Sequence, residues 1–324
     1  MKTLVTGATG FMGAKLCEAL AKRGDQIRAL VFPDEDYSHI KDYIAETVEG
    51  DITRPETLDG VGDGVEVVYH LAARVLDYGN RDEFYGIILD GTKNMLEACA
   101  GKSGRFVYIS SICACGTGRH NKGMTEDDAC VKTGVFYGDA KLDAEGLVKS
   151  YGDKFPKGYV IIRPANVTGP RSVWVNELGQ TIRDSLFAYF DGGRHSASLI
   201  HIDNLVDGLV LAGSKEEAAN RTYFFRDDWE VTWKRYVDDL ANVLDMKVWL
   251  SLPFGVAWLL GGVAGKTAHW FNGRPVITRH IVGLMGRDND VDTTRARTEL
   301  GWKTRVSYEE AMAEIEKWVK ENML

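Results

Sequence analysis

The chain has 324 residues, of which 44% are hydrophobic and 27% charged, as is typical of a globular protein with one large domain or slightly more. Its net charge of −8 and the lack of a long basic run argue against a nucleic-acid partner. The five cysteines form neither a CxxC pair nor a disulfide-like framework, which favours free thiols, a reducing compartment and no metal site. Because the first predicted strand begins at residue 2, no room is left for a signal peptide, and we expect a cytoplasmic protein.

The first segment of the chain combines a strand, spaced glycines and a helix. Residues 2–6 are apolar and β-branched enough for a buried strand, and residues 11–23 have a helical pattern. Gly7 permits a tight turn, Gly10 lets the backbone approach a pyrophosphate, and Gly13 lets the helix lie close to the strand. The helix N-terminus offers free N–H groups to an anion. The segment therefore predicts a dinucleotide-binding site.

Strands and helices then alternate along the chain. The further strand candidates are residues 26–31, 46–49, 65–70, 105–110 and 158–163, and the helical stretches are near 82–101 and 136–152. This alternation implies parallel β-α-β units, so the predicted fold class is α/β, a Rossmann-type doubly wound parallel sheet.

After residue 170 the alternation ends, and a helical tail follows at residues 308–322. We expect residues 1–170 to form the dinucleotide-binding domain, with segments at roughly 195–225 returning to it. Residues 171–324 are expected to form mainly a smaller, interleaved substrate-binding part. This part would cover the carboxyl ends of the strands, where ligands bind in such sheets.

A candidate catalytic set follows the strand at 105–110. That strand ends in two serines, and Ser111 is followed at a distance by Tyr137 and Lys141, which share one helix face at i and i+4. A tyrosine titrates near 10, and a neighbouring cation stabilises its phenolate. We expect Ser111 to bind the substrate oxygen, Tyr137 to move the proton, and Lys141 to assist both Tyr137 and the cofactor ribose while a hydride is transferred.

Two other features near these segments have simpler interpretations. Tyr37 and Lys41 have the same spacing but follow no serine-ended strand, so they are interpreted as a solvated surface pair. His70, at the end of a strand, is interpreted as a hydrogen-bonded structural residue. Cys113 and Cys115 follow the catalytic serine and are interpreted as small buried thiols.

Taken together, these motifs resemble the extended short-chain dehydrogenases/reductases, of the epimerase/dehydratase-like kind. The residues that carry the resemblance are 6–13 (TGATGFMG), 50–52 (GDI), 69–73 (YHLAA), 91–98 (GTKNMLEA), 107–111 (VYISS), 137–141 (YGDAK), 163–170 (RPANVTGP) and 201–204 (HIDN). The resemblance covers most of the chain. One departure is Ile88, at a position where an asparagine is frequent in the family.

The resemblance implies a set of cofactor contacts. Asp51 and Ile52 would flank the adenine, residues 71–73 would line the cofactor groove, and residues 164–167 would surround the nicotinamide. The full set implied is Gly7, Thr9, Gly10, Phe11, Met12, Gly13, Phe32, Asp51, Ile52, Leu71, Ala72, Ala73, Ile109, Tyr137, Lys141, Pro164, Asn166 and Val167.

Within the family, the C-terminal part resembles the 3β-hydroxysteroid dehydrogenase and dihydroflavonol reductase branch. The supporting segments are residues 248–265, 274–278 (RPVIT) and 292–302 (DTTRARTELGW). This resemblance implies an NAD(P)-dependent oxidoreductase that interconverts a secondary alcohol and a ketone on a fairly apolar, steroid-like or related small molecule.

Two other functions stay open. A nucleotide-sugar epimerase or dehydratase would use the same serine, tyrosine and lysine, and its diphosphate would need cations such as Arg171, Arg183 and Arg194. A cofactor-sensing protein without catalysis is a third interpretation, which the intact catalytic set disfavours.

The segment 248–265 contains no charged residue and meets the lower length limit for a membrane span. Pro253 and four glycines argue against a stable span. The segment is therefore interpreted first as a buried helix or substrate lid, and second as a contact with a membrane surface.

The residues after the second strand bear on the choice between NAD and NADP. NAD-specific proteins place an acidic residue at this strand end, and NADP-specific ones an arginine. Here Val31 and Phe32 are followed after one residue by Asp34, Glu35 and Asp36. Three carboxylates would repel a 2′-phosphate, so NAD is predicted, with NADP as the alternative.

Extended family members often form homodimers through the helices placed here at 82–101 and 136–152, and we expect a homodimer. The apolar residues that favour it are Met95, Leu96, Ala98, Leu142, Leu147, Val148 and Tyr151.

Overall fold

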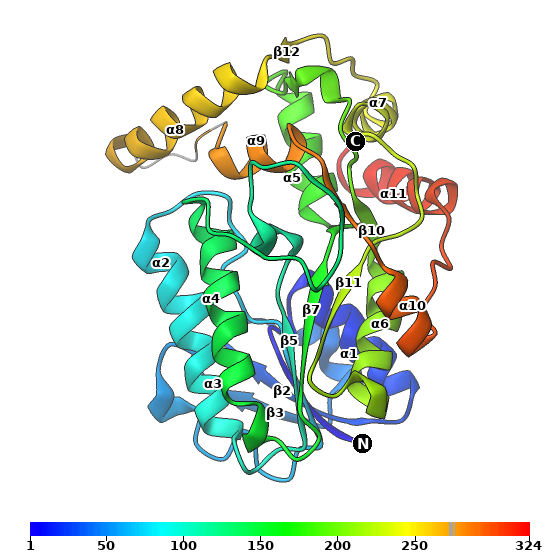
Figure 1. Ribbon diagram of the computed structural model, residues 1–324. Helices are drawn as coiled ribbons and strands as arrows, with labels where there is room; N and C mark the ends of the chain where they lie inside the picture. The colour runs from blue at the N-terminus through cyan, green and yellow to red at the C-terminus, as the bar shows by residue number, and fades with distance from the viewer. Residues whose placement is uncertain (272–274, 276) are drawn as a thin grey trace.

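The computed structural model describes the chain except for residues 272–274 and 276 and the side chains of 265–271. A seven-stranded sheet occupies the lower half of the molecule as seen in Figure 1, and all its neighbouring strands are parallel. Its strand order is β11-β7-β5-β4-β1-β2-β3. The bounds are β1 (Lys2–Thr6), β2 (Gln26–Val31), β3 (Glu46–Glu49), β4 (Val67–His70), β5 (Arg105–Ile109), β7 (Tyr159–Pro164) and β11 (Arg221–Phe225). The predicted α/β, doubly wound class is confirmed.

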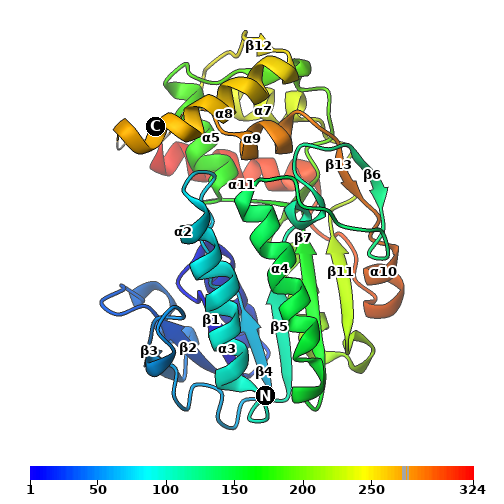
Figure 2. The same cartoon turned by 60° about the vertical axis from the view of Figure 1, so that its left-hand side comes forward.

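Helices cover both faces of this sheet, which explains why nearly all residues of its central strands β1, β4, β5 and β7 are buried. On one face lie α1 (Phe11–Lys22) and α6 (Ile202–Ser214), whose buried side chains pack with Val5 of β1. On the other face lie α3 (Gly91–Cys99) and α4 (Phe136–Ser150), which pack with Leu4 of the same strand (Figure 2). Adjacent residues of a strand point to opposite faces, so each central strand contributes to both cores.

The order of the strands reverses beside β1, which pairs with β2 on one side and with β4 on the other. In open sheets of this kind, ligands bind in the crevice outside the carboxyl ends of the strands at such a reversal. The turn after β1 and the residues after β4, β5 and β7 therefore meet at one edge of the sheet.

The helix predicted at 82–101 is three pieces in the structure. α2 (Arg81–Tyr85) is followed by a π-helical turn at Gly86–Asp90, and α3 then begins at Gly91. In the π turn the Ile88 carbonyl accepts a hydrogen bond from the Thr92 hydroxyl at 2.5 Å. A single π turn changes the spacing of apolar residues too little for the sequence pattern to reveal it.

Most of the remaining elements form the upper part of the molecule, above the carboxyl ends of the strands, whereas α10 (Thr294–Leu300) lies lower, beside β11, and packs against β11 and α6 (Figure 1). The remaining elements are β6 (Asn121–Met124), β8 (Asn166–Thr168), α5 (Val173–Arg183), β9 (Tyr189–Phe190), β10 (Leu199–His201), α7 (Trp233–Val243), β12 (Ser251–Leu252), α8 (Phe254–Phe271), α9 (Arg279–Met285), β13 (Asn289–Val291), α10 and α11 (Tyr308–Asn322). Three two-stranded parallel pairs join β10 to β8, β12 to β9 and β13 to β6.

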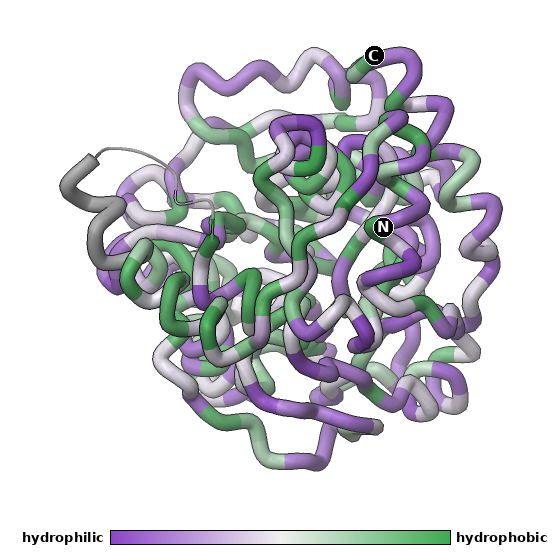
Figure 3. The backbone as a smooth tube through the Cα atoms, turned by 90° about the horizontal axis from the view of Figure 1, so that it is seen from above, coloured by the Kyte–Doolittle hydropathy of each residue, from purple (hydrophilic) through white to green (hydrophobic). Residues whose placement is uncertain are grey.

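This upper part has its own apolar core around Trp174, Trp233 and Tyr236. Seen from above, hydrophilic segments follow much of the outline of the chain and hydrophobic segments are frequent inside it (Figure 3). The N-terminus lies at the bottom of the molecule in Figure 1, below the sheet. The C-terminus lies in the upper part, where the Arg183 side chain of α5 donates a hydrogen bond to the Met323 carbonyl.

The uncharged segment 248–265 is not a buried helix. It comprises the residues before β12, β12 itself and most of α8, and it exposes Trp249 by 82% and Leu259 by 65%. Glycines and a proline interrupt the segment, so only Ala257 and Gly261 are buried in α8 as far as its side chains are described. Among the described residues, no helix combines the length and the hydropathy that crossing a bilayer requires. Three of its leucines line the cavity described below.

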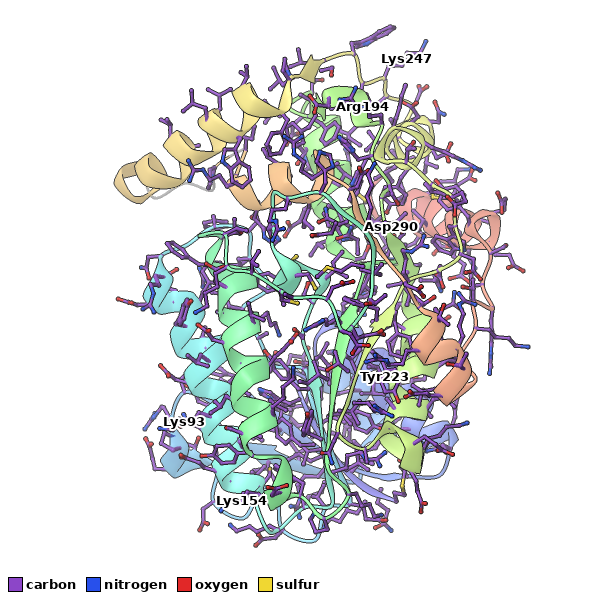
Figure 4. The ribbon with its side chains drawn as sticks, viewed as in Figure 1. Lys93, Lys154, Arg194, Tyr223, Lys247 and Asp290 are labelled. Carbon is purple, nitrogen blue, oxygen red and sulfur yellow. The ribbon has the colours of Figure 1, made fainter. Side chains whose placement is uncertain are left out.

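The apolar residues on which the homodimer prediction rested lie largely within the chain's own core. Met95, Leu96 and Val148 are fully buried where α3 and α4 cover the sheet. The exposed positions of these helices are mainly polar and include Lys93, labelled in Figure 4, and Lys149. The homodimer stays a prediction that depends on the family resemblance alone.

Candidate active site

A cavity of about 1230 Å³ runs along the carboxyl ends of the strands. One end is lined by the turn after β1 and the other by residues of α5 and α9. The structure places every predicted catalytic and cofactor-binding residue in its wall: Gly7, Thr9, Gly10, Phe11, Met12, Gly13, Phe32, Asp51, Ile52, Leu71, Ala72, Ala73, Ile109, Ser111, Tyr137, Lys141, Pro164, Asn166 and Val167. Tyr37 and Lys41 do not line this cavity.

Two glycines of the turn at the first end, Gly7 and Gly13, leave no room for a side chain. Gly7 has φ +67°, and a Cβ added there would lie 2.9 Å from the Ala72 nitrogen. A Cβ at Gly13 would lie 2.0 Å from the Gly7 carbonyl oxygen. Gly10 is the N-cap of α1, has no side chain to bind the free N–H groups, and is followed by a first turn without an acidic residue. The turn therefore fits a pyrophosphate at the helix N-terminus.

An acidic side chain lies beside this turn. Of Asp34, Glu35 and Asp36, Glu35 alone lines the cavity. Its carboxylate accepts hydrogen bonds from the Thr9 hydroxyl at 2.7 Å and from the Phe32 backbone N–H at 3.2 Å. The Asp36 carboxylate instead accepts the Ser38 N–H at 2.9 Å. One carboxylate, and not three, therefore faces the predicted position of the adenosine ribose.

The predicted catalytic residues meet where β5 and α4 approach each other. Ser111 is the N-cap of a short 3₁₀-helix, η4 (Ile112–Cys115), and its hydroxyl accepts the Cys113 N–H at 3.1 Å. Gly138 follows Tyr137 in α4, and a Cβ there would lie 2.4 Å from the Cys113 carbonyl oxygen. Glycine thus lets η4 lie against α4, which brings Ser111 and Tyr137 to one side of the cavity.

Burial shifts the pKa values of Tyr137 and Lys141 in opposite directions. It raises the pKa of Tyr137, and a hydrogen bond with the Ser111 hydroxyl opposes that rise. Burial lowers the pKa of Lys141 to about 7, against the field of the Glu145 carboxylate. The Lys141 ammonium donates to the Ile109 carbonyl at 2.6 Å. The Ser111 hydroxyl therefore favours the tyrosine phenolate, and the expected effect of the Lys141 charge on that phenolate stays a prediction.

A buried ion pair lies behind the catalytic residues. The Arg163 guanidinium of β7 donates to both carboxylate oxygens of Glu145, at 2.9 and 2.7 Å. The Ser110 hydroxyl donates to the same carboxylate at 2.5 Å. Both charged side chains are almost completely buried. This network connects α4 to β5 and β7 directly beneath the site.

His70 is a hydrogen-bonded structural residue, as interpreted from the sequence. Its Nδ1 lies 2.8 Å from the Thr6 hydroxyl, and its Nε2 lies 3.1 Å from the Thr92 hydroxyl. Burial lowers the pKa of His70 to about 3, so the ring is neutral at physiological pH. Cys113 lines the cavity, but burial raises the pKa of its thiol, which disfavours a nucleophilic role.

The second end of the cavity is mainly apolar. Its wall includes Trp174, Leu178, Phe187, Leu252, Leu260, Ile277, Ile281, Leu284 and Met285. Arg171 also lines this end, with the carboxylates Asp77, Glu177 and Asp184. Sequence reasoning missed His280 and Asp77 here. The only signal for His280 in the sequence is its position two residues after Thr278, a typical helix-capping residue. Its distance from Tyr137 along the chain hides the contact that folding creates.

Comparison with known proteins identifies the family of this chain. Residues 3–224 match the NAD dependent epimerase/dehydratase family, and the chain belongs to that family. Membership makes it an NAD-dependent enzyme with an extended short-chain dehydrogenase/reductase type of fold.

Relatives in sequence include two reductases. The chain is 28% identical to the 4-hydroxy-2-methyl-3-oxo-4-farnesyl-3,4-dihydroquinoline-1-oxide ketoreductase of Stigmatella aurantiaca, over 96% of this chain and 95% of that protein. It is 26% identical to the 2-alkyl-3-oxoalkanoate reductase of Stenotrophomonas maltophilia, over 97% and 98% of the two chains.

Solved structures with the same fold include two epimerases. UDP-glucuronic acid 4-epimerase from Bacillus cereus, in complex with UDP-glucuronic acid and NAD, has a TM-score of 0.78 at 21% identity over 99% of both chains. UDP-glucose 4-epimerase from Thermotoga maritima has a TM-score of 0.80 at 19% identity over 100% of both chains.

Proposed function

We propose that this protein is an NAD-dependent oxidoreductase that interconverts a ketone and a secondary alcohol on a fairly apolar small molecule. The observation that carries the proposal is the apolar end of the cavity, which adjoins Ser111 and Tyr137. Burying apolar surface contributes about 25 cal/mol per Å², so such a wall favours a hydrophobic substrate. The two reductases among the relatives have names that describe oxo compounds with alkyl or farnesyl groups.

Each catalytic residue has a role in this proposal. The bound cofactor supplies or accepts the hydride. The Tyr137 hydroxyl gives its proton to the carbonyl oxygen during reduction and takes it back during oxidation, and Ser111 holds that oxygen by a hydrogen bond. Lys141, with a pKa near 7, is able to hold the cofactor ribose and to replace the proton that Tyr137 gives up.

The charges around the cavity favour this function over nucleotide-sugar epimerisation. Of the three arginines considered as diphosphate partners, only Arg171 lines the cavity. Arg183 binds the carbonyl of Met323, and Arg194 is 72% exposed near Asp191 (Figure 4). Asp77, Glu177 and Asp184 line the substrate end and would repel a diphosphate.

A substrate comparison tests the proposal. We expect oxidation of NADH in the presence of ketones, with kcat/KM rising about fourfold per added buried methylene, because each contributes about 0.8 kcal/mol. UDP-glucose and UDP-glucuronic acid are measured in parallel by product chromatography. Epimerisation of either sugar without ketone reduction would favour the alternative enzyme. Binding of NADH without turnover of any substrate would favour a cofactor sensor.

NAD is expected to be preferred to NADP by at least about tenfold in kcat/KM, because the Glu35 carboxylate would face the 2′-phosphate of NADP. The double substitution Phe32→Arg and Glu35→Ser should shift the preference toward NADP. The matched control is Phe32→Arg with Asp34→Ser, since Asp34 does not line the cavity. A wild-type preference for NADP, or equal shifts in both variants, would contradict this assignment.

Several broader features remain proposals. We assign residues 1–170, together with segments at 195–225, to the cofactor-binding domain, and most of 171–324 to substrate binding. The exposed apolar residues of segment 248–265 support contact with a membrane surface or a lipid-like substrate. A homodimer and a cytoplasmic location complete the proposed description, the latter supported by the free state of all five cysteines.

A further inference from the structure

His280 occupies a constrained position at the substrate end of the cavity. It is the second residue of α9, whose N-cap Thr278 accepts the Ile281 N–H at 3.2 Å. The Thr278 hydroxyl also donates to the Asp77 carboxylate at 3.1 Å. Asp77 follows β4 in the chain, so this bond connects the start of α9 to the loop above the sheet. His280 and Asp77 both line the cavity.

The His280 ring contacts the catalytic tyrosine. The centroids of the His280 and Tyr137 rings are 5.2 Å apart, at an interplanar angle of 82°. A single bound molecule would therefore be able to place one atom against the Tyr137 hydroxyl and another, a few covalent bonds away, against the His280 imidazole. The two side chains come from α9 and α4, which are more than a hundred residues apart in the chain.

One nitrogen of this ring lacks a partner. His280 Nδ1 is buried and makes no hydrogen bond with any residue in the described part of the chain. The two ring nitrogens of His70, deeper in the same fold, are both within hydrogen-bond distance of threonine hydroxyls. A buried polar atom without a partner is costly, and His280 lines the cavity, so a ligand oxygen that reaches Nδ1 would supply the missing hydrogen bond.

The surroundings of His280 determine what it is able to bind. Burial lowers the pKa of His280 to about 4, against the opposing field of Asp77. The ring is therefore neutral at physiological pH, with one nitrogen that donates and one that accepts. A neutral imidazole beside a carboxylate suits a carbonyl or hydroxyl oxygen and disfavours an anionic group.

We propose that His280 binds a second, uncharged oxygen of the substrate, located a few bonds from the carbonyl that is reduced. The substrate class is then a hydroxyketone, a diketone or an oxoester with an apolar remainder. This inference rests on the proposed function, since it assumes that the reacting carbonyl lies at Tyr137 and Ser111. It makes His280 a residue that determines specificity, while proton transfer stays with Tyr137.

A pair of matched substrates tests the inference. We compare an alkyl 3-oxoester with a simple ketone of the same length that lacks the ester group, using wild type, His280→Phe and His280→Asn. His280→Phe should lower kcat/KM for the oxoester by about tenfold or more, because the bound oxygen loses its partner. The simple ketone should change by less than about threefold, and His280→Asn, which keeps a donor and an acceptor, should recover part of the loss.

The outcomes separate this inference from the proposed function. Equal losses for both ketones in His280→Phe, with unchanged NADH affinity and unfolding midpoint, would show a structural role and overturn the inference. If wild type binds NADH but reduces neither ketone, the proposed function fails. In that case, the binding of the 3-hydroxyester, monitored through the quenching of tryptophan fluorescence, tests His280 independently. A Kd for the 3-hydroxyester that is the same in His280→Phe as in wild type also overturns the inference.

Discussion

Tyr137→Phe is expected to lower kcat by about 10²- to 10⁴-fold, the range supplied by general acid–base groups, and to leave NAD affinity nearly unchanged. The substitution removes the hydroxyl that moves the proton. The ring remains, and its edge-to-face contacts with Phe84 at 6.4 Å and His280 at 5.2 Å are kept. Steady-state kinetics with the best ketone found, together with titration of NADH fluorescence, measures both quantities.

Tyr37→Phe is the matched control for this experiment. Tyr37 and Lys41 have the same spacing as Tyr137 and Lys141, but Tyr37 precedes a short 3₁₀-helix and does not line the cavity. Its substitution should leave kcat within about twofold of wild type. Lys141→Ala should differ from the two tyrosine variants. It should weaken turnover and NAD binding together, because Lys141 is expected to assist both Tyr137 and the cofactor ribose. A loss of kcat smaller than threefold in Tyr137→Phe would remove Tyr137 from the mechanism.

Glu145→Ala is expected to lower the free energy of unfolding by about 3–5 kcal/mol, because it leaves the Arg163 guanidinium buried without its counter-charge. The pair is held by two hydrogen bonds, at 2.9 and 2.7 Å, and both side chains are almost completely buried. Urea unfolding followed by tryptophan fluorescence measures the change, provided that a single transition is seen.

The double variant Glu145→Leu with Arg163→Met is the control. Replacing a buried ion pair by apolar side chains of similar volume is often neutral, so this variant should be clearly more stable than Glu145→Ala. A destabilisation below about 1 kcal/mol in Glu145→Ala would mean that water reaches Arg163. A double variant as unstable as Glu145→Ala would show that shape, and not charge, decides the stability here.

The sequence predicted the sheet well, and the residues predicted to bind the cofactor all line the cavity, because both predictions depend on local patterns. Short apolar runs such as 106–109 indicate buried parallel strands. The glycine spacing at 7–13 follows from the close approach of the backbone to its neighbours and to a phosphate. The i and i+4 spacing of Tyr137 and Lys141 is likewise a local property of one helix.

The substrate end could not be predicted in the same way. His280 reaches Tyr137 only because α9 returns over the sheet, a contact between distant segments that leaves no periodic signal. The exposure of segment 248–265 was also missed. A run of residues without charge is found in a buried core helix, in a lid over a substrate and in a surface that contacts a membrane, and the sequence does not distinguish these. The acidic run at 34–36 suggested three repelling charges, but backbone geometry turns only Glu35 toward the cavity.

The positions of the two chain ends have a practical consequence for measuring binding. The N-terminus lies at the lower end of the molecule in Figure 1. The cavity is lined by residues at the carboxyl ends of the strands, which is the other end of the sheet. The last residues instead contact α5, which contributes to the cavity wall, through the bond between Arg183 and the carbonyl of Met323. Attachment to a sensor surface through the N-terminus should therefore leave ligand access intact, whereas a fusion at the C-terminus would place its first residues against a helix that shapes the substrate end.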